Sequence, residues 1–464
     1  MENIREDPYI EQLRFIASKL NSKIYLVGGA IRDIFLNRQA NDYDFVVFGN
    51  LKRLAKEVSS RFLCKYILYE KKLKTYRVFC RAKTIDLSEP RAQTIEEDLK
   101  KRDFTINSMA VDLDSLKLID PLGGKKDLKK GIIRINSDKA IDDDPLRILR
   151  GFRLAATFRF DIEAQTVTLF RDKVKLLKKI SPERITEELK LLFLLNETFT
   201  YLLIMDRVGV IDTLFEDLTL TNACIQSSKH LFDVKTHSLS VYNYIEWALN
   251  RLERVIGKSF KKYLIHYTME KETLLVAFKL AALFHDAAKP FCKIVVDGNV
   301  KFPMHEIESA KLFEKYAKIY PFGRKISKLT KFFIEKHIEP ANLYKAWSLN
   351  ELEELNKVNF FINYGENGID LLIFALADTL AKGKISASKR EVYIMFLQEM
   401  ADYYYSIEKK LKEKPILPAE EILKLYPSLD KKKLKPILTN IKKLQIANAI
   451  KSKEEAISIV KKMI

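Results

Sequence analysis

The chain has 464 residues, and its Lys and Arg exceed its Asp and Glu by 19 charges. This length predicts more than one domain, at about 150 residues per domain. The basic balance fits either a Lys-rich solvated surface or a polyanionic partner, because Lys and Arg gain affinity by releasing the counterions of phosphates. Charge alone leaves these two interpretations open.

The sequence gives no sign of export or of membrane insertion. The N-terminus lacks an apolar signal region, and no apolar run approaches the ~18 residues of a membrane span. The four cysteines, at positions 64, 80, 224 and 292, have neither a zinc-binding spacing nor the pattern of a disulfide framework. These features predict a cytoplasmic protein with no membrane partner.

Secondary-structure signals divide the chain into a mixed first part and a helical remainder. Apolar periodicity and β-branched runs predict helices over 5–20, 30–36 and 51–62, and strands over 23–27, 42–48, 66–69, 75–79 and 84–87. After residue 142 helical periodicity dominates. We therefore expect an α+β fold, with domain boundaries near 136–141, 216–230 and 408–418.

Two glycines end the first predicted strand. Gly28 and Gly29 precede a helix that carries Arg32 and Asp33 in its first turn. Glycines at such a turn let the backbone approach a ligand, and a helix N-terminus offers N–H groups to phosphate oxygens. By itself the pattern is more often an ordinary turn.

Twelve residues separate Gly29 from the first of two closely spaced carboxylates. Asp42 and Asp44 are separated by one residue on a predicted strand, so their side chains share a face. Such a pair suits two Mg²⁺ ions, which prefer oxygen ligands and usually also hold substrate phosphates. Together with the Gly-Gly turn, the pair resembles the signature of the DNA polymerase β-type nucleotidyltransferase superfamily.

Two Arg–Asp combinations follow. Arg102 and Asp103, in a run that also holds Asn107, can bind a ribose because Arg donates and Asp accepts hydrogen bonds, although a surface ion pair is the alternative. Asp144 and Arg147 flank Pro145, a residue typical of a first helical turn. Their spacing predicts a shared helix face that could read the edge of a base, while stabilisation of the helix dipole is the alternative.

Residues 24–200 resemble class II tRNA nucleotidyltransferases and the related bacterial poly(A) polymerases. The resemblance rests on ordered motifs: Leu26–Asp33 with Asp42 and Asp44, Lys101–Asp103 (an Arg-Arg-Asp motif with Lys first), Asp120-Pro121 with Gly123-Gly124, Asp143–Arg147 (a Glu-Asp-x-x-Arg motif with Asp first), and Arg184 with Glu188.

The resemblance implies a head domain with a small mixed sheet, an all-α neck and template-independent addition of C or A to tRNA from CTP or ATP. Asp42 and Asp44 would bind Mg²⁺, and Asp86 is a candidate third carboxylate, with an ordinary edge-strand acid as the alternative. Nucleotide-binding residues would be Gly28, Gly29, Arg32, Asp33, Arg102, Asp103, Asn107, Asp144 and Arg147. The short segment between Asp86 and residues 94–97 favours a partial, CC-adding activity, because family members that add the whole CCA usually have a longer one.

Histidines appear only after residue 229. Imidazoles and carboxylates are ligands of first-row metals, although a lone His on an apolar helix is more often a packed core residue. The order of these histidines and of two aspartates resembles the HD phosphohydrolase superfamily. The resemblance implies a metal site, for which a divalent transition metal is a candidate, and a possible phosphoesterase activity. The residues of this site would be His237, His285, Asp286, His305, His337 and Asp378. Ala288 replaces the usual Gly of the His-Asp-x-Gly-Lys run. His230 and His266 lie outside this pattern and are expected at the surface or in packing.

These signals predict four segments: a nucleotidyltransferase head (1–138), a helical neck (139–220), an HD helical domain (221–405) and a helical tail (406–464). A poly(A) polymerase, and a non-catalytic RNA-binding regulatory protein, are the alternative functions.

Overall fold

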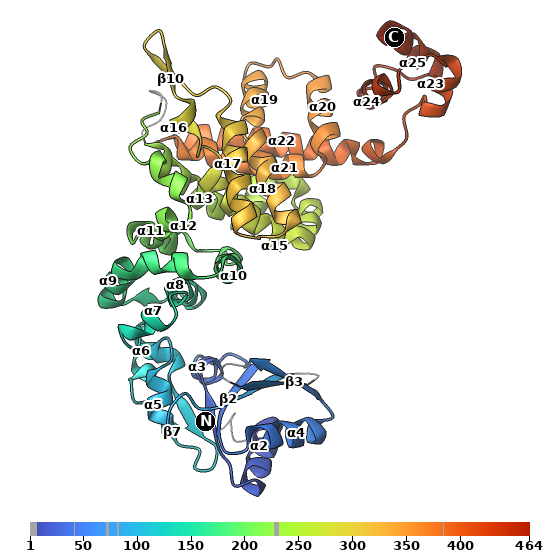
Figure 1. Ribbon diagram of the computed structural model, residues 1–464. Helices are drawn as coiled ribbons and strands as arrows, with labels where there is room; N and C mark the ends of the chain where they lie inside the picture. Colours follow the sequence, from blue (N-terminus) through green and yellow to red (C-terminus); the bar gives the residue numbers. More distant parts are fainter. Residues whose placement is uncertain (1–6, 41, 71–73, 81–82, 227–231, 384) are drawn as a thin grey trace. The chain divides into compact units, whose positions relative to one another are not determined.

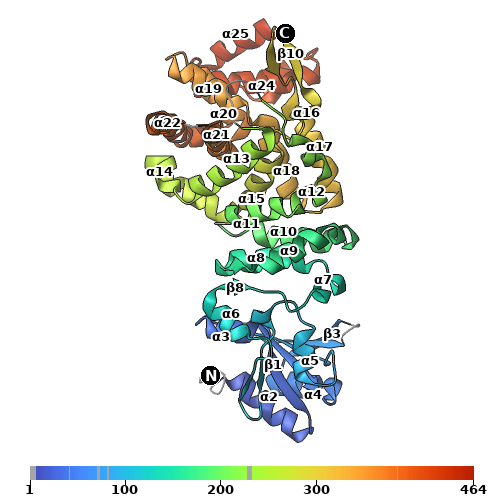
Figure 2. The same ribbon diagram turned by 90° about the vertical axis from the view of Figure 1, so that its left-hand side faces the viewer.

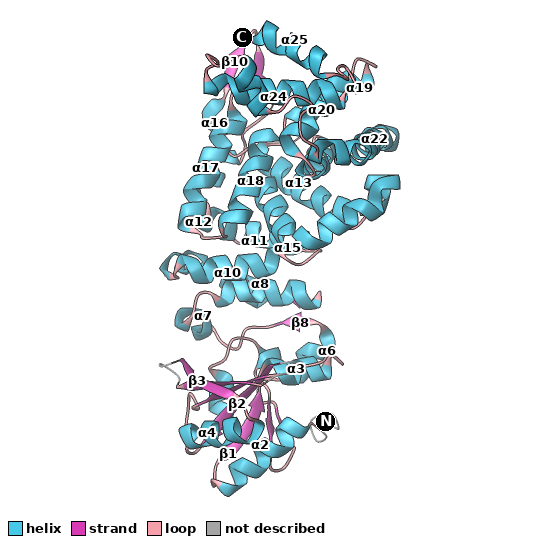
Figure 3. Ribbon diagram, turned by 90° about the vertical axis from the view of Figure 1, so that its right-hand side faces the viewer, coloured by secondary structure: helices cyan, strands magenta, loops and turns pink. Residues whose placement is uncertain are grey.

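The computed structural model describes residues 7–464 except 41, 71–73, 81–82, 227–231 and 384. The chain forms two compact units, residues 1–214 and 215–464. Strands concentrate in the first unit, and helices make up most of the second (Figure 3). The expected α+β class is confirmed. Among the described residues, no helix has the length and apolar character needed to cross a bilayer.

A mixed seven-stranded sheet is the centre of the first unit (Figure 1), with spatial order β3-β4-β5-β2-β1-β6-β7. Strand β2 pairs antiparallel with β1 and parallel with β5. The strands are β1 Lys23–Val27, β2 Asp42–Phe48, β3 Lys65–Glu70, β4 Thr75–Phe79, β5 Thr84–Ser88, β6 Ala110–Asp112 and β7 Leu118–Ile119, with a separate pair β8 Ile132–Ile133 and β9 Asp161–Ile162. The five strands predicted from the sequence are present within one residue at each end.

One face of this sheet packs against the helix α5, Ile95–Lys100. Tyr25 and Val27 of β1 and Val46 of β2 form a buried cluster with Ile95 and Leu99 of α5. Since alternate residues share a face, Asp42 and Asp44 lie on the same side of β2 as Val46. The packing therefore brings the segment after α5, which begins with Lys101, to the face that carries the two carboxylates.

The remaining helices of the first unit follow the sequence closely. Helix α2 begins where the Asp7 carboxylate accepts the Tyr9 and Ile10 N–H groups and Pro8 supplies a helical φ; residues 5 and 6 of the predicted helix lie outside the described part. The helices are α2 Pro8–Lys19, α3 Gly29–Phe35, α4 Leu51–Phe62, α6 Gly124–Lys130, α7 Lys139–Asp143, α8 Arg147–Phe158, α9 Ala164–Lys173, α10 Pro182–Phe193, α11 Phe199–Arg207 and α12 Val210–Leu214, with 3₁₀ turns at Thr105–Asn107 (η1) and Val174–Lys179 (η2). Helices α8 and α10 pack directly on each other (Figure 2).

Two cysteines form a disulfide that the sequence spacing did not suggest. Cys64 precedes β3 and Cys80 follows β4, and the antiparallel register pairs Lys65 with Phe79. This register places Cys64 opposite Cys80, with their Cα atoms 5.2 Å apart. The interpretation of four unpaired cysteines is therefore wrong for this pair, because partners across a hairpin depend on strand register.

The second unit is built from helices around a core in which α13, α15, α18 and α21 pack as neighbours. A separate cluster around Leu417, Ile441 and Val460 packs the last helices together. The elements are η3 Glu216–Thr221, α13 Val234–Leu249, α14 Leu252–Ile256, η4 Gly257–Ser259, α15 Phe260–Phe284, α16 Lys289–Cys292, β10 Ile294–Val296, β11 Asn299–Lys301, α17 His305–Ile319, α18 Arg324–Lys336, α19 Glu339–Ser348, α20 Glu354–Tyr364, α21 Asn367–Ala381, α22 Ala387–Lys412, α23 Ala419–Leu425, α24 Lys431–Ile446 and α25 Lys453–Met463.

Candidate functional sites

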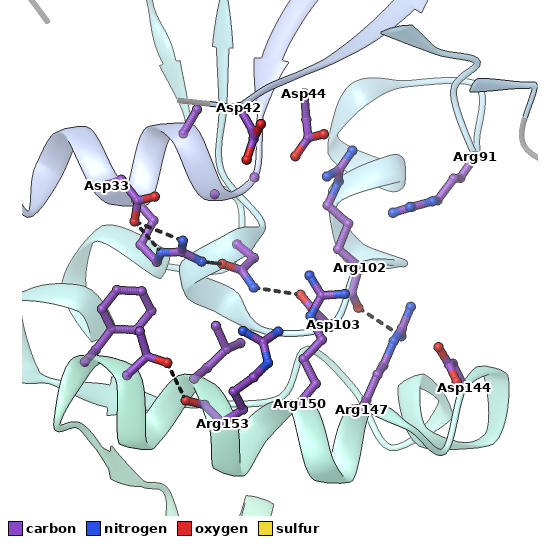
Figure 4. Close-up of a pocket in the computed structure, with 18 of the residues that line it drawn as sticks. Asp33, Asp42, Asp44, Arg91, Arg102, Asp103, Asp144, Arg147, Arg150 and Arg153 are labelled. Atoms are coloured by element: carbon purple, nitrogen blue, oxygen red, sulfur yellow. Dashed lines mark hydrogen bonds and ion pairs between the residues drawn. The ribbon is translucent and has the colours of Figure 1, made fainter. Parts of the chain in front are cut away.

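A pocket of about 670 Å³ opens beside the ends of β1 and β2 in the first unit (Figure 4). It brings together residues that lie as far apart in the sequence as Gly28 and Arg184. All the predicted nucleotide-binding residues and both predicted catalytic carboxylates line it: Gly28, Gly29, Arg32, Asp33, Asp42, Asp44, Arg102, Asp103, Asn107, Asp144 and Arg147.

The turn after β1 requires a glycine. Gly28 has a φ of 73°, in the left-handed region that side chains rarely adopt. A Cβ atom at this position would lie 3.5 Å from both the Asp44 Oδ2 atom and the Arg102 Nη1 atom. The turn therefore keeps the backbone close to the carboxylates and to one pocket arginine.

The two carboxylates of β2 lie at the exposed end of the strand. Desolvation raises the pKa of Asp44, and the negative charges of Asp86 and Asp42 raise it further. Carboxylates that repel one another in this way gain stability from a cation. The oxygen-only set of Asp42 and Asp44 fits Mg²⁺.

A hydrogen-bonded chain crosses the floor of the pocket. Arg32 bonds the Asp33 carboxylate at 2.9 Å and the Asn107 side-chain oxygen at 2.7 Å. The Asn107 amide donates to Asp103 at 3.2 Å, and the Arg150 guanidinium lies 3.0 Å from the other Asp103 oxygen. Burial would raise the pKa of Asp103, but Arg150 and the Phe104 N–H hold it below its ordinary value. Asp103 is therefore held as a charged hydrogen-bond acceptor.

An acidic side chain positions Arg102, and backbone carbonyls position Arg147. The buried Asp98 carboxylate accepts a bond from Arg102 Nε at 3.0 Å. Arg147 donates to the backbone carbonyls of Lys101, Arg102 and Ala140 at 3.1–3.2 Å. The acidic run that contains Asp98 lies in α5, which ends at Lys100.

Asp144 and Arg147 do not share a helix face as the spacing predicted. Asp144 adopts an extended conformation after α7, and α8 begins at Arg147. Pro145 disfavours helical geometry at the preceding residue, which explains the break. Asp144 instead pairs with Arg184 of α10 at 2.8 Å, and Glu188 of the same helix pairs with Arg153 at 2.6 Å.

Asp86 lies on β5 directly beside Asp44, in parallel register. Both of its oxygens are bonded by the Arg77 guanidinium, at 2.7 and 2.8 Å. Asp86 is not among the residues that line the pocket. Its position next to Asp44 suits a third metal ligand, whereas its bidentate partner suits an ordinary strand acid.

Several pocket residues were not among the predicted nucleotide-binding residues. They include Arg150, Arg153, Glu70 and Arg91. A sequence signal exists for the first two: Arg147, Arg150 and Arg153 recur every three residues at the start of α8, and such a row lies on one helix face.

The second unit holds a buried cluster of imidazoles and carboxylates. His237 Nε2 lies 3.0 Å from Asp378 Oδ1 and 3.3 Å from His285 Nε2. His305 Nε2 and His337 Nε2 lie 3.3 and 3.7 Å from Asp286 Oδ1. The ligand atoms form two groups, His237 with His285 and Asp378, and Asp286 with His305 and His337, each within 4.8 Å. All six residues of the predicted metal set therefore come together.

Backbone carbonyls orient all four rings. The Nδ1 atoms of His237, His285, His305 and His337 lie 2.8–3.3 Å from the carbonyls of Ala381, Ala282, Phe302 and Ile334. A neutral imidazole that donates from Nδ1 presents a bare lone pair at Nε2. Four such lone pairs then converge on two carboxylates, an arrangement that a metal ion satisfies.

The charges of this cluster also fit a metal. Burial lowers the pKa of His337 to about 3, so this ring is neutral. Burial would raise the pKa of Asp286, but Lys289 and His285 hold it well below its ordinary range. Asp286 Oδ1 is buried and accepts no hydrogen bond from the described residues. The mixed nitrogen and oxygen donors fit a divalent transition metal.

Two lysines form ion pairs with the two carboxylates of this cluster. Lys289 Nζ lies 2.6 Å from Asp286 Oδ2, and Lys382 Nζ lies 2.8 Å from Asp378 Oδ2. Lys289 is the Lys of the His-Asp motif, whereas nothing in the sequence pattern singled out Lys382. Of the two histidines outside the pattern, His266 is half-buried beside Asp370, and His230 lies outside the described residues.

Two family models match stretches of the chain. Residues 24–134 match the family described as "Poly A polymerase head domain", and residues 159–220 match "Probable RNA and SrmB- binding site of polymerase A". The CC-adding tRNA nucleotidyltransferase of Geobacter sulfurreducens is 37% identical over 193 residues, 41% of this chain and 45% of that protein. Over these stretches the chain is similar to poly(A) polymerases and tRNA nucleotidyltransferases.

Two further comparisons extend over nearly the whole chain. The CC-adding tRNA nucleotidyltransferase of Thermus thermophilus is 24% identical over 439 residues, 93% of this chain and 91% of that protein. The structure of the Thermotoga maritima CCA-adding enzyme complexed with tRNA_CCA is similar with a TM-score of 0.65, 21% identity and coverage of 99% and 98%. The latter similarity shows the fold. At higher identity the chain spans about half or less of the length of the curated relatives it matches.

Proposed function

We propose that this protein is a template-independent tRNA nucleotidyltransferase that adds C, A or both to the tRNA 3′ end from CTP or ATP and releases pyrophosphate. The observation that carries the proposal is the single pocket in which Asp42 and Asp44 face the Arg102–Asp103 and Asp144–Arg147 pairs. The relatives support it, since they are CC-, CCA- and A-adding enzymes.

Asp42 and Asp44 would hold Mg²⁺, which when bound polarises the α-phosphate and lowers the pKa of the RNA 3′-hydroxyl. The hydroxyl oxygen attacks the α-phosphorus, its proton passes to solvent, and the bond to pyrophosphate breaks. The pocket arginines would stabilise the negative charge of the triphosphate, because they surround it in a partly desolvated space.

The two Arg–Asp combinations would select the nucleotide. Asp103, charged and fixed by Arg150, would accept a ribose hydroxyl, while Arg102 donates. Arg147 uses three of its five N–H donors on backbone carbonyls, so two remain for the edge of a base. Asp144 would supply the matching acceptor. Base selection would then come from the protein and not from a nucleic-acid template.

A partial, CC-adding activity agrees best with the segment after Asp86. Strand β5 ends at Ser88 and α5 begins at Ile95, so a short connection joins the sheet to the ribose-binding segment. Of the curated relatives, the near full-length one from Thermus thermophilus is a CC-adding enzyme.

The test is extension of three tRNAs, ending before CCA, after C and after CC, with CTP and ATP supplied separately. We expect addition of two C residues from CTP and no addition of A after CC. Addition of all three nucleotides would contradict the partial activity but not the transferase. Long A tracts on unstructured RNA would favour the poly(A) polymerase alternative. No extension of any RNA would favour a regulatory RNA-binding protein.

A second function is favoured by the buried cluster of the second unit. We propose that it holds divalent metal and hydrolyses phosphoesters, so that a tRNA ending in a 3′-phosphate or cyclic phosphate is freed for extension. The four oriented histidines, with Asp286 and Asp378, would hold the ion, which when bound activates water and stabilises charge on the phosphate. The proposal fails if the wild type and a His285→Ala, Asp286→Ala variant extend a 3′-phosphorylated tRNA equally.

A further inference from the structure

The second unit also contains a pocket that is separate from both proposed sites. It has a volume of about 570 Å³ and lies among α15, α18 and the junction of α20 with α21. Its lining contains none of the six cluster residues. A volume of several hundred Å³ suffices for a small molecule.

The chemistry of the lining is specific. Phe332 and Tyr364 supply two aromatic rings whose centroids are 5.2 Å apart at 59°. Asn363 and Asn367 line the same pocket, and their amides make no hydrogen bond within the described residues. Rings offer a stacking surface, and an amide carries both a donor and an acceptor, which suits the edge of a heteroaromatic base.

Positive charge lies beside these groups. Lys325 and Lys328 line the pocket from α18, one helical turn apart. Lys325 pairs with Glu270, whereas no acid of the described residues lies within ion-pair distance of Lys328. An exposed lysine beside a pocket favours an anionic group such as a phosphate.

A partly buried network of hydrogen bonds and ion pairs lies beside the pocket. His266 Nε2 lies 2.9 Å from Asp370 and its Nδ1 lies 3.4 Å from Glu366. Asp370 also accepts the Tyr263 hydroxyl at 2.7 Å, and Glu366 accepts the Tyr405 hydroxyl at 2.5 Å. Burial would lower the pKa of His266, but the bond to Asp370 raises it above its ordinary value. Hydrogen bonds and ion pairs therefore hold the imidazole of His266 in place at the pocket wall.

The pocket continues along α20. A neighbouring cavity shares Asn363 and Tyr364 with it and adds Asn356 and Asn359. These asparagines recur at three- and four-residue spacing, so they lie on one face of the helix. A polar row that leads away from an aromatic pocket suits a ligand longer than one nucleotide.

We propose that the pocket bounded by Phe332, Tyr364, Asn363, Asn367, Lys325 and Lys328 binds a nucleoside phosphate, with the base on the two rings and the phosphate at Lys328. The ligand is either a free nucleotide or one nucleotide of a single-stranded RNA, which continues along the asparagine row. This inference does not depend on the activity of the first unit.

The test uses the full chain in EDTA, which removes divalent metal from the other two sites. The probes are AMP, CMP and a six-nucleotide single-stranded RNA, measured by isothermal titration calorimetry. Lys328→Ala and Asn363→Ala are compared with Lys318→Ala, an exposed lysine of α17 outside the pocket. Phe332→Leu removes the ring and keeps an apolar side chain.

We expect Phe332→Leu and Lys328→Ala each to weaken binding about tenfold, in line with ~1–3 kcal/mol per stacked base, while Lys318→Ala leaves it unchanged. Weaker binding of AMP or CMP by the pocket variants than by Lys318→Ala identifies a free nucleotide as the ligand of this pocket, and the same difference for the oligonucleotide alone identifies an RNA segment. The proposal is overturned if none of the probes binds, or if the pocket variants bind as tightly as Lys318→Ala.

Discussion

The two acidic centres of this protein differ in exposure and in ligand chemistry. Asp42 and Asp44 lie at the exposed end of a strand, in a pocket lined by arginines, and offer only oxygen. The cluster around Asp286 is buried, has four imidazoles and is enclosed by helices. An open carboxylate pair suits Mg²⁺ that arrives and leaves with a triphosphate, whereas a buried set of nitrogen and oxygen ligands suits a resident transition metal.

The difference has a structural origin. The first site combines the end of β2 with side chains of α3, α8 and α10 and of the segment after α5, and these side chains are held by ion pairs such as Asp103 with Arg150. The second uses the ends of several helices, where free backbone carbonyls fix the imidazoles. In the second site the backbone itself therefore orients the imidazoles.

The largest effect is expected at the β2 carboxylates. Asp42→Asn and Asp44→Asn should each lower tRNA extension at least about a thousandfold, since a bound metal contributes several kcal/mol to phosphoryl transfer. Extension of labelled tRNA lacking CCA measures this. The metal content of the second unit should not change. Full extension by either variant would contradict metal catalysis at β2.

Loss of the buried metal should affect stability but not ordinary extension. The wild type should retain metal after desalting, as measured by inductively coupled plasma mass spectrometry. The double variant His285→Ala, Asp286→Ala should not retain it. A ligand held at 100 times its Kd adds about 2.7 kcal/mol to the free energy of unfolding, so chelation should lower the melting temperature of the wild type. His266→Gln is the matched control, and equal metal content in all variants would contradict the assignment.

Removal of Arg150 should lower the stability of the first unit at neutral pH and make that stability less sensitive to acid than in the wild type. The pKa of Asp103 is depressed in the folded state, so its stabilising contribution is present above the ordinary carboxyl pKa and is lost as pH falls through the folded value. Arg150→Ala should raise this pKa and cost about 1–3 kcal/mol at neutral pH, because a buried carboxylate loses its partner. Urea unfolding between pH 3 and pH 7 measures this. A pH profile parallel to that of the wild type would contradict it.

The smallest effect is expected at Asp86. Arg77 occupies both of its oxygens, so Asp86→Asn should change extension within about fivefold, near 1 kcal/mol. The same extension assay compares it with Asp44→Asn, its neighbour across the parallel register. A loss as large as that of Asp44→Asn would make Asp86 a third metal ligand.

Local sequence predicted much of the first unit. The strands and the Gly28 turn follow from β-branched runs and glycine conformation, and both are present within a residue. The helix face assumed for Asp144 and Arg147 was wrong, because Pro145 separates α7 from α8. The Cys64–Cys80 pair was also missed, since it depends on the register of a hairpin.

By itself, the sequence determined the order and chemical types of the two residue sets, Gly-Gly with Asp-x-Asp and the spaced His and Asp residues. Only the tertiary structure decided which residues meet. It placed Arg150 beside Asp103, Arg77 beside Asp86 and Lys382 beside Asp378, and it formed an aromatic pocket from four helices. The physical reason is that periodicity fixes the face of an element, whereas the partner of that face depends on how the elements pack.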